Sequence, residues 1–385
     1  MIDFDQIIDR SASASVKYDA RKAVFGREDI TPLWVADMDF ATPESVTAAL
    51  IERAKHPVLG YTLHPRSMFI AMQDWFQQRH NWTIDRNEII MCPGVVPSMH
   101  AAIMALTEIG DKVIIQPPVY PPFFTAVTET KRELVLNPLQ LKDNRYQIDF
   151  EHLEQCAAEG AKLLLLCSPH NPVGRVWQQE ELEQILAIAQ RYQLIIISDE
   201  IHADLIFPEY KHIPLATLTA EVTIITAVSP SKTFNIAGLG LSSLVVKENK
   251  HRKAINQVFE QWHISACNPF SITAFEAAYK DGEQWLDRLM AYLVQTKTEV
   301  TEFFEQSLPE IKVIDTEGTY LLWLDCRQLN MTDKVLKHFF IEQVGLGLNT
   351  GISFGEEGSG FMRLNIAAPR TIIIQAISQI KLALD

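Results

Sequence analysis

KLLLLCSPHNPVGRVWQQEELEQILAIAQRYQLIIISDE, residues 162–200, places a helical pattern between two apolar runs, and this stretch decides the fold. The runs LLLL (163–166) and LIII (194–197) lack the polar alternation of a half-exposed strand. Both faces of such strands must be covered, as in a parallel sheet. Helical and strand-like runs alternate in the same way elsewhere, and they predict an α/β fold of the doubly wound kind. The other strand-like runs are EIIMC (88–92), KVIIQ (112–116) and VTIITAV (222–228).

The pattern changes after Gly282. Residues 283–307 predict one long helix, and GTYLLWLDC (318–326) and GFMRLNIA (360–367) predict strands. A chain of 385 residues is too long for one ordinary core. We therefore expect a large domain over 48–285 and a smaller α+β domain formed by 1–47 and 286–385. The glycine-rich segment 345–360 is expected to be a mobile connection.

Composition limits the partners. The formal net charge is −14, which argues against nucleic acid and against anionic membrane surfaces. The five cysteines are scattered and form no CxxC pair, so we expect neither a disulfide framework nor a metal site. The start of the chain lacks the pattern of a signal peptide, and no apolar run has membrane-spanning length. The cytoplasm is the expected location.

Ligands of doubly wound proteins bind beyond the carboxyl ends of the strands, so the residues there are the first candidates for a site. EIIMC ends in a Pro-Gly turn, where Gly94 allows a tight bend and the amides of Val95 and Val96 open a helix. The N-terminus of a helix can bind an anion, so this turn is a possible anion site. Most turns of this kind bind no ligand, however, so the motif alone does not decide. Asn171, in SPHNPVG (168–174), either donates a hydrogen bond into the crevice or only bonds its own backbone.

Two charged side chains also follow apolar runs. Asp199 comes after LIIIS, where it either caps a helix or faces a cation inside the site. Lys232, in SPSKTFN (229–235), has no charged neighbour, and it is either a surface lysine or a desolvated nucleophilic amine. A small anionic aldehyde with a protonated pyridine nitrogen could bind all four groups at these strand ends: the amides after Gly94, the Asn171 amide, the Asp199 carboxylate and the Lys232 amine. Pyridoxal phosphate is such a molecule.

Three motifs, SPHNPVG, SDEIH (198–202) and SPSKTFN, resemble in order and spacing those of the fold-type I pyridoxal-phosphate enzymes of the class I/II aminotransferase family. The resemblance covers nearly the whole chain. It implies a large cofactor-binding domain, with a mainly parallel seven-stranded sheet between helices, and a smaller α+β domain. Further segments are similar to the MalY/PatB-type cystathionine β-lyases, namely LWVADMDFATPE (33–44), GYT (60–62), PGVVPSMHAAI (93–103) and FMRLNIA (361–367).

The resemblance implies a role for each matching residue. Lys232 would hold the cofactor as a Schiff base, and Asp199 would hold its pyridinium nitrogen. Asn171 would bond the ring oxygen O3′. Arg363 would clamp the substrate carboxylate beneath the loop at Ala36. Tyr120 would stack on the ring and face the substrate with Asn171, and His202 would lie near O3′. Tyr61 would reach the phosphate from the neighbouring subunit, and it counts with Lys232 and Asp199 among the implied catalytic residues. The other implied phosphate contacts are Gly94, Val95, Val96, Ser229 and Ser231.

The same resemblance implies a homodimer with shared active sites that acts on a small amino acid. We favour a C–S β-lyase that cleaves cystathionine or a related cysteine thioether to a thiol (homocysteine), pyruvate and ammonia. An aminotransferase is the alternative, because it needs the same residues, and a regulatory or binding protein is a second. Two departures suit the lyase branch. Gly240 stands where many aminotransferases carry a phosphate-binding arginine, and His170 stands where many relatives carry asparagine.

Overall fold

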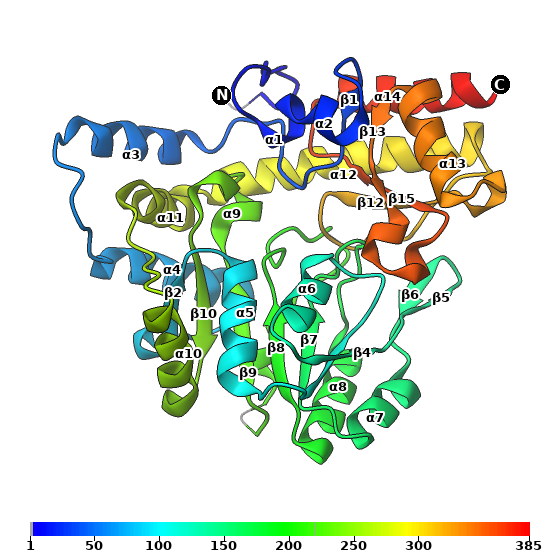
Figure 1. Cartoon of the computed structure of the whole chain (residues 1–385). Helices are drawn as coiled ribbons and strands as arrows, with labels where there is room; N and C mark the ends of the chain where they lie inside the picture. The colour runs from blue at the N-terminus through cyan, green and yellow to red at the C-terminus, as the bar shows by residue number, and fades with distance from the viewer. Residues whose placement is uncertain (1–2, 220) are drawn as a thin grey trace.

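A seven-stranded sheet lies at the centre of the larger part of the chain in the computed structural model, which describes residues 3–219 and 221–385 (Figure 1). Strand β10 is antiparallel to both of its neighbours, and the other adjacent pairs are parallel. In spatial order the strands are β2 (Ile89–Cys92), β10 (Ser242–Val246), β9 (Ile224–Val228), β8 (Ile195–Asp199), β7 (Leu163–Cys167), β3 (Lys112–Ile115) and β4 (Glu133–Leu136).

Helices cover both faces of this sheet, as the unbroken apolar runs predicted. Successive side chains of a strand point to opposite faces. In β7, Leu163 and Leu165 pack with one group of helices, and Leu164 and Leu166 pack with another. The fold class predicted from the sequence is confirmed. The first face carries α5 (Val95–Leu106), α6 (Pro122–Thr128) and α10 (Asn249–Gln261), and the second carries α4 (Arg66–His80), α7 (Phe150–Ala158), α8 (Gln179–Tyr192) and α11 (Pro269–Asp281).

A second, antiparallel sheet of four strands lies in the C-terminal part of the chain. The long helix α12 (Glu283–Ser307) runs across the molecule toward it (Figure 1). The expected boundary after residue 285 falls inside this helix, and the division into two domains stays a prediction. The other elements here are β11 (Lys312–Val313), β12 (Leu321–Asp325), β15 (Phe361–Asn365), β14 (Asn349–Thr350), α13 (Asp333–His338) and α14 (Arg370–Leu384), and β5 (Gln140–Lys142) pairs with β6 (Arg145–Gln147) nearer the large sheet.

The N-terminal segment lies against the C-terminal part of the chain. Strand β1 (Thr31–Pro32) pairs in parallel with β13 (Leu346–Gly347), and both chain ends lie on the same side of the molecule (Figure 1). Residues 33–40 then cross towards the end of the large sheet. The helices of this segment are α1 (Val16–Asp19), α2 (Arg21–Phe25) and α3 (Glu44–Lys55).

The glycine-rich segment 345–360 is folded, where a mobile connection was predicted. It contains β13, β14 and two short 3-10 turns at Gly351–Phe354 and Glu356–Gly358. A Cβ atom at Gly351 would lie 2.0 Å from the carbonyl oxygen of Gly358, so the two turns pack backbone against backbone. The glycines allow this close approach, which the sequence pattern did not reveal.

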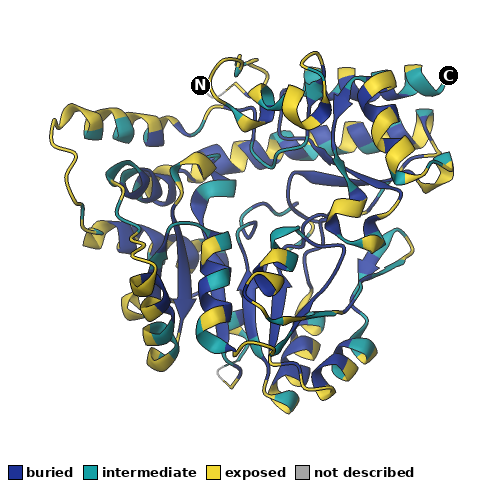
Figure 2. Ribbon diagram, viewed as in Figure 1, coloured by how far each residue is buried: buried dark blue, intermediate teal, exposed yellow. Residues whose placement is uncertain are grey.

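Burial follows the layers. Figure 2 shows the inner strands of the large sheet buried and the outer faces of the surrounding helices exposed, and the edge strand β4 is partly exposed. The loop between α3 and α4 is exposed along most of its length (Figure 2). Among the described residues, none of the helices is both long and apolar enough for a membrane span.

Candidate active site

A cavity of about 300 Å³ opens beyond the carboxyl ends of β2, β7, β8 and β9. It lies where the sequence predicted a ligand site, at the end of the strands of a doubly wound sheet. Eleven of the predicted site residues line it, while Arg363 lies behind Asn171 and Tyr61 lies elsewhere. The eleven are Ala36, Gly94, Val95, Val96, Tyr120, Asn171, Asp199, His202, Ser229, Ser231 and Lys232.

Lys232 reaches the cavity from the short helix α9 (Pro230–Thr233). The Ser229 side chain caps this helix by accepting a hydrogen bond from the Ser231 amide (3.2 Å). Lys232 Nζ donates to the carbonyl oxygen of Ala36 at 2.6 Å. Burial, together with the positive charge of Arg363, lowers the pKa of Lys232 to about 8. A substantial fraction of this amine is therefore unprotonated in mildly alkaline solution.

Asp199 is the last residue of β8, between the ends of β7 and β9. Its Oδ1 accepts a hydrogen bond from the Ile201 amide (3.1 Å), and a turn rather than an α-helix follows. Burial raises the pKa of Asp199 to about 7, although the Lys232 charge opposes this shift. Within the described residues Asp199 makes no ion pair at salt-bridge distance. A cation placed beside the carboxylate would lower its pKa and relieve the cost of burial.

Arg363, on β15, approaches the cavity from the second sheet and is 4% exposed. Its Nη1 donates to Asn171 Oδ1 at 2.9 Å. Its Nη2 donates to the Trp34 carbonyl (2.9 Å) and to Asn349 Oδ1 (2.7 Å), while Nε has no partner in the described part of the chain. Burial lowers the pKa of Arg363 to about 10. The guanidinium thus stays charged near neutral pH and holds that charge behind Asn171, which lines the cavity.

The opposite end of the cavity is made of backbone and hydroxyl groups. Helix α5 begins directly after Gly94, and no side chain of residues 3–219 or 221–385 caps it, so its first amides are free toward the cavity that Gly94, Val95 and Val96 line. The N-terminus of a helix of this length favours an anion. Gly240, which also lines this end, has φ +54°, and a Cβ there would lie 3.2 Å from the Pro93 carbonyl oxygen. The Ser229 hydroxyl donates to the Leu241 carbonyl (2.8 Å).

His202 and Tyr120 complete the wall between these two ends. His202 is buried edge-on to Tyr320, with 6.1 Å between ring centroids, and its Nδ1 has no hydrogen-bond partner among the residues that the structure describes. Burial and the charges of Lys232 and Arg363 lower the pKa of His202 to about 3, so the imidazole is neutral. The Tyr120 amide donates to the Asn171 carbonyl at 3.1 Å. A neutral imidazole with a free nitrogen can still bond a polar ligand atom.

Sequence reasoning missed several residues that shape this site. Asn349 holds Arg363 from the neighbouring strand β14. The Tyr320 hydroxyl donates to the Ala36 carbonyl at 2.9 Å. Asn235 holds the loop that contains Ala36, and its position in the SPSKTFN motif was the only available signal. Tyr61 is fully exposed on the loop between α3 and α4, outside the cavity of its own chain.

The model of the family described as aminotransferase class I and II matches residues 28–376, and the chain belongs to this family. The resemblance inferred from the motifs is confirmed. The chain is 38% identical to cystathionine beta-lyase PatB of Bacillus subtilis strain 168, over the full length of both. It is 33% identical to Protein MalY of Escherichia coli strain K12, over 98% of this chain and 97% of that protein. Cystalysin from Treponema denticola, whose crystal structure contains pyridoxal 5′-phosphate, matches with TM-score 0.97 and 37% identity over 100% of this chain and 99% of that one.

Proposed function

We propose that the protein is a pyridoxal-phosphate-dependent C–S β-lyase. It cleaves cystathionine or a related L-cysteine thioether to a thiol, pyruvate and ammonia. The observation that carries this proposal is the convergence of a lysine amine, a buried carboxyl group and an arginine around one cavity. The relatives named as cystathionine β-lyases match this chain along nearly its whole length, and they favour the lyase over the aminotransferase.

The chemistry of the cavity suits pyridoxal phosphate. The phosphate would bind the free amides at the start of α5, at Val95 and Val96. Lys232 would hold the aldehyde carbon, because its depressed pKa leaves a nucleophilic amine. The ring nitrogen would supply the cation that the buried Asp199 carboxylate lacks, and the unpartnered Nδ1 of His202 can bond the ring oxygen.

Each charged side chain then has a task in the reaction. Once bound, pyridoxal phosphate supplies an electron sink beside the α-carbon of the substrate. Arg363 binds the substrate carboxylate with its planar guanidinium, which Asn171 and Asn349 hold in place. The Lys232 amine removes the proton from the α-carbon of the substrate and holds it on Nζ. Asp199 keeps its negative charge next to the ring nitrogen and so keeps that nitrogen protonated.

The partition of products tests the function. The purified protein is given cystathionine while pyruvate and free thiol are followed, and in parallel it is given alanine with a 2-oxo acid. We expect pyruvate and thiol from cystathionine and little amino transfer from alanine. The opposite result would make the protein an aminotransferase, and a protein inactive in both assays would be a binding or regulatory protein.

The position of the cofactor is tested separately. Borohydride reduction should fix the cofactor to the peptide that contains Lys232. The Lys232→Ala protein should carry no label, whereas the Lys162→Ala control, which removes an exposed lysine before β7, should be labelled like the wild type. Label on another lysine of the wild-type protein would contradict the assignment.

We also propose a cytoplasmic homodimer in which Tyr61 enters the site of the neighbouring subunit. The support is its exposure: Tyr61 is fully exposed in the single chain, and three apolar neighbours on the same loop are 58–87% exposed, namely Val58, Leu59 and Leu63. A contiguous exposed apolar segment marks an interaction surface. Light scattering should give twice the mass of the chain. An active monomer at assay concentration would refute the shared site.

A further inference from the structure

Two donors share one carbonyl oxygen beside the cavity. Lys232 Nζ donates to the Ala36 carbonyl at 2.6 Å, and the Tyr320 hydroxyl donates to the same oxygen at 2.9 Å. A carbonyl oxygen has two lone pairs and can accept both bonds at once. Tyr320 is 1% exposed, so its hydroxyl has no free access to bulk water, whereas Ala36 is half-buried and lines the cavity.

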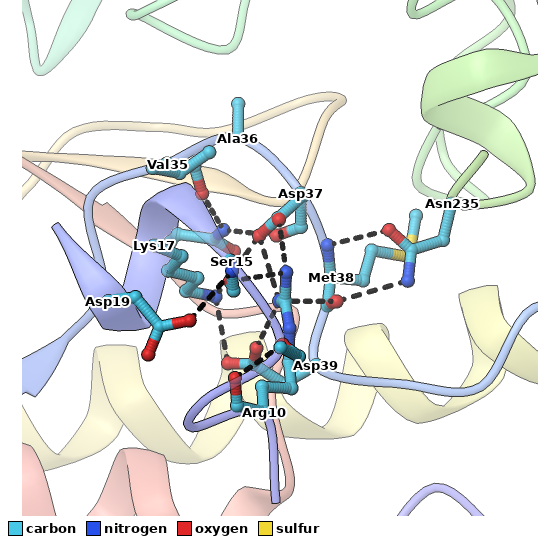
Figure 3. A network of polar contacts seen from close by, with 12 residues as sticks. Arg10, Ser15, Lys17, Asp19, Val35, Ala36, Asp37, Met38, Asp39 and Asn235 are labelled. Atoms are coloured by element: carbon cyan, nitrogen blue, oxygen red, sulfur yellow. Dashed lines mark hydrogen bonds and ion pairs between the residues drawn. The ribbon is translucent and has the colours of Figure 1, made fainter. Parts of the chain in front are cut away.

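The backbone around this carbonyl is held firmly from both sides. Asn365 Nδ2 donates to the carbonyls of Val35 and Asp37, each at 2.7 Å, and so brackets Ala36. Figure 3 shows Asn235 on the other side of the loop, bonded to Met38. Side-chain amides therefore fix the carbonyl groups on both sides of Ala36, and its oxygen is a fixed acceptor.

Charged residues of the N-terminal segment hold the same loop. Arg10 pairs with Asp37 and Asp39, each at 2.6 Å, and it also donates to the Met38 carbonyl at 3.1 Å. The fully buried Lys17 pairs with Asp39 at 2.8 Å (Figure 3). The Ala36 oxygen therefore cannot turn away to find another donor if one of its two partners leaves.

We propose that Tyr320 is a positioning residue for Lys232, and that its hydroxyl satisfies the Ala36 carbonyl whenever the lysine leaves that carbonyl for the cofactor. This inference rests on the proposed function. Lys232 Nζ forms a C=N bond to the aldehyde carbon, and the aldehyde oxygen leaves as water. The lysine nitrogen then keeps at most one proton and is drawn towards the cofactor, so Tyr320 is the donor that remains on Ala36.

Loss of the Tyr320 hydroxyl should weaken the binding only of ligands that form a covalent bond with Lys232. Without the Tyr320 hydroxyl, covalent attachment of Lys232 would leave the half-buried Ala36 carbonyl without either of its two donors, which is costly once the cofactor fills the cavity. A ligand that fills the same cavity but leaves Lys232 on the Ala36 carbonyl would meet no such cost. Pyridoxamine phosphate is that ligand, because it has an amine in place of the aldehyde.

The experiment compares the two ligands in the Tyr320→Phe protein. The full-length chain is stripped of cofactor and titrated with pyridoxal phosphate and, separately, with pyridoxamine phosphate. We expect affinity for pyridoxal phosphate to fall about tenfold, as for one carbonyl that loses its hydrogen bond, with affinity for pyridoxamine phosphate unchanged. Tyr146→Phe is the matched control, because it removes another buried hydroxyl, which accepts from Trp323 Nε1 (3.2 Å) away from Ala36. Both affinities should then stay at the wild-type value.

If Tyr320→Phe lost the same affinity for both ligands, Tyr320 would be a merely structural residue and the inference would be wrong. Unchanged affinity for both ligands would also overturn the inference. Thermal unfolding of each variant separates these outcomes from a general loss of fold. If the wild-type protein bound no pyridoxal phosphate at all, the proposed function itself would be wrong. The two failures are therefore distinguishable.

Discussion

Replacing Lys17 with methionine should destabilise the protein, although Lys17 lies outside the cavity. Its side chain is fully buried, with Nζ 2.8 Å from Asp39 and 3.7 Å from Asp37, and the Asp39 side chain is 3% exposed. Removal of one partner of a buried ion pair leaves the other charge uncompensated, at a cost of about 3–5 kcal/mol. Arg10 still pairs with Asp39, so we expect the lower end, about 3 kcal/mol of unfolding free energy.

Urea unfolding, followed by far-ultraviolet circular dichroism, measures this loss. The control is Lys22→Met, which removes a lysine of the same segment that is 75% exposed and pairs with Glu28 at 3.4 Å. A surface pair of that kind contributes about 0–1 kcal/mol. The KM for the amino-acid substrate should also rise in Lys17→Met, because the loop supplies the Trp34 carbonyl that holds Arg363. Equal stability of the two variants would refute the reasoning.

Three further changes probe the site and its surroundings. Asp199→Ala should lose nearly all β-elimination with circular dichroism unchanged, because the ring nitrogen would lose the charge that keeps it protonated; near-wild-type turnover would make Asp199 a turn residue only. Arg363→Lys should lower kcat/KM by about tenfold or more, because an ammonium cannot replace two parallel hydrogen bonds; steady-state kinetics with cystathionine measures this. Burial lowers the pKa of His170 to about 4, so between pH 6.5 and 4 the unfolded chain binds a proton that the folded chain does not. Stability should therefore be full above pH 6.5 and fall by about 3 kcal/mol towards pH 4, and His170→Asn should flatten this slope in urea unfolding at several pH values.

Local patterns were enough to predict the fold and to indicate which strand ends would line the cavity. The LLLL and LIII runs became β7 and β8, the adjacent middle strands that carry Asp199 at their shared end. Asp199 and Lys232 were detectable because a charge at or soon after the end of an apolar strand is unusual unless it has a partner or a function. Parallel strands bring such residues to one edge, so sequence position alone indicated that they would meet.

Residues that act through distant contacts were not predictable in this way. Tyr320 and Ala36 lie 284 positions apart, and Asn349 meets Arg363 only through strand pairing. Nothing in the residues near Arg10 or Lys17 signals that their charges hold a loop of the active site. Asn235 was quoted within a motif, but its task depends on a loop 197 positions away. Register and tertiary packing, which local composition does not encode, decide these contacts.

If the proposed homodimer shares its sites through Tyr61, two inactive variants should restore each other's activity when they are mixed. If a site combines Lys232 of one subunit with Tyr61 of the other, each Lys232→Ala homodimer still carries intact copies of Tyr61, and each Tyr61→Phe homodimer carries intact lysines. After subunit exchange in an equal mixture, half of the dimers are mixed, and each of these has one site with both wild-type groups. The mixture should therefore recover about a quarter of wild-type activity from partners that have almost none alone. Two damaged copies of the gene in one cell would complement each other by the same route.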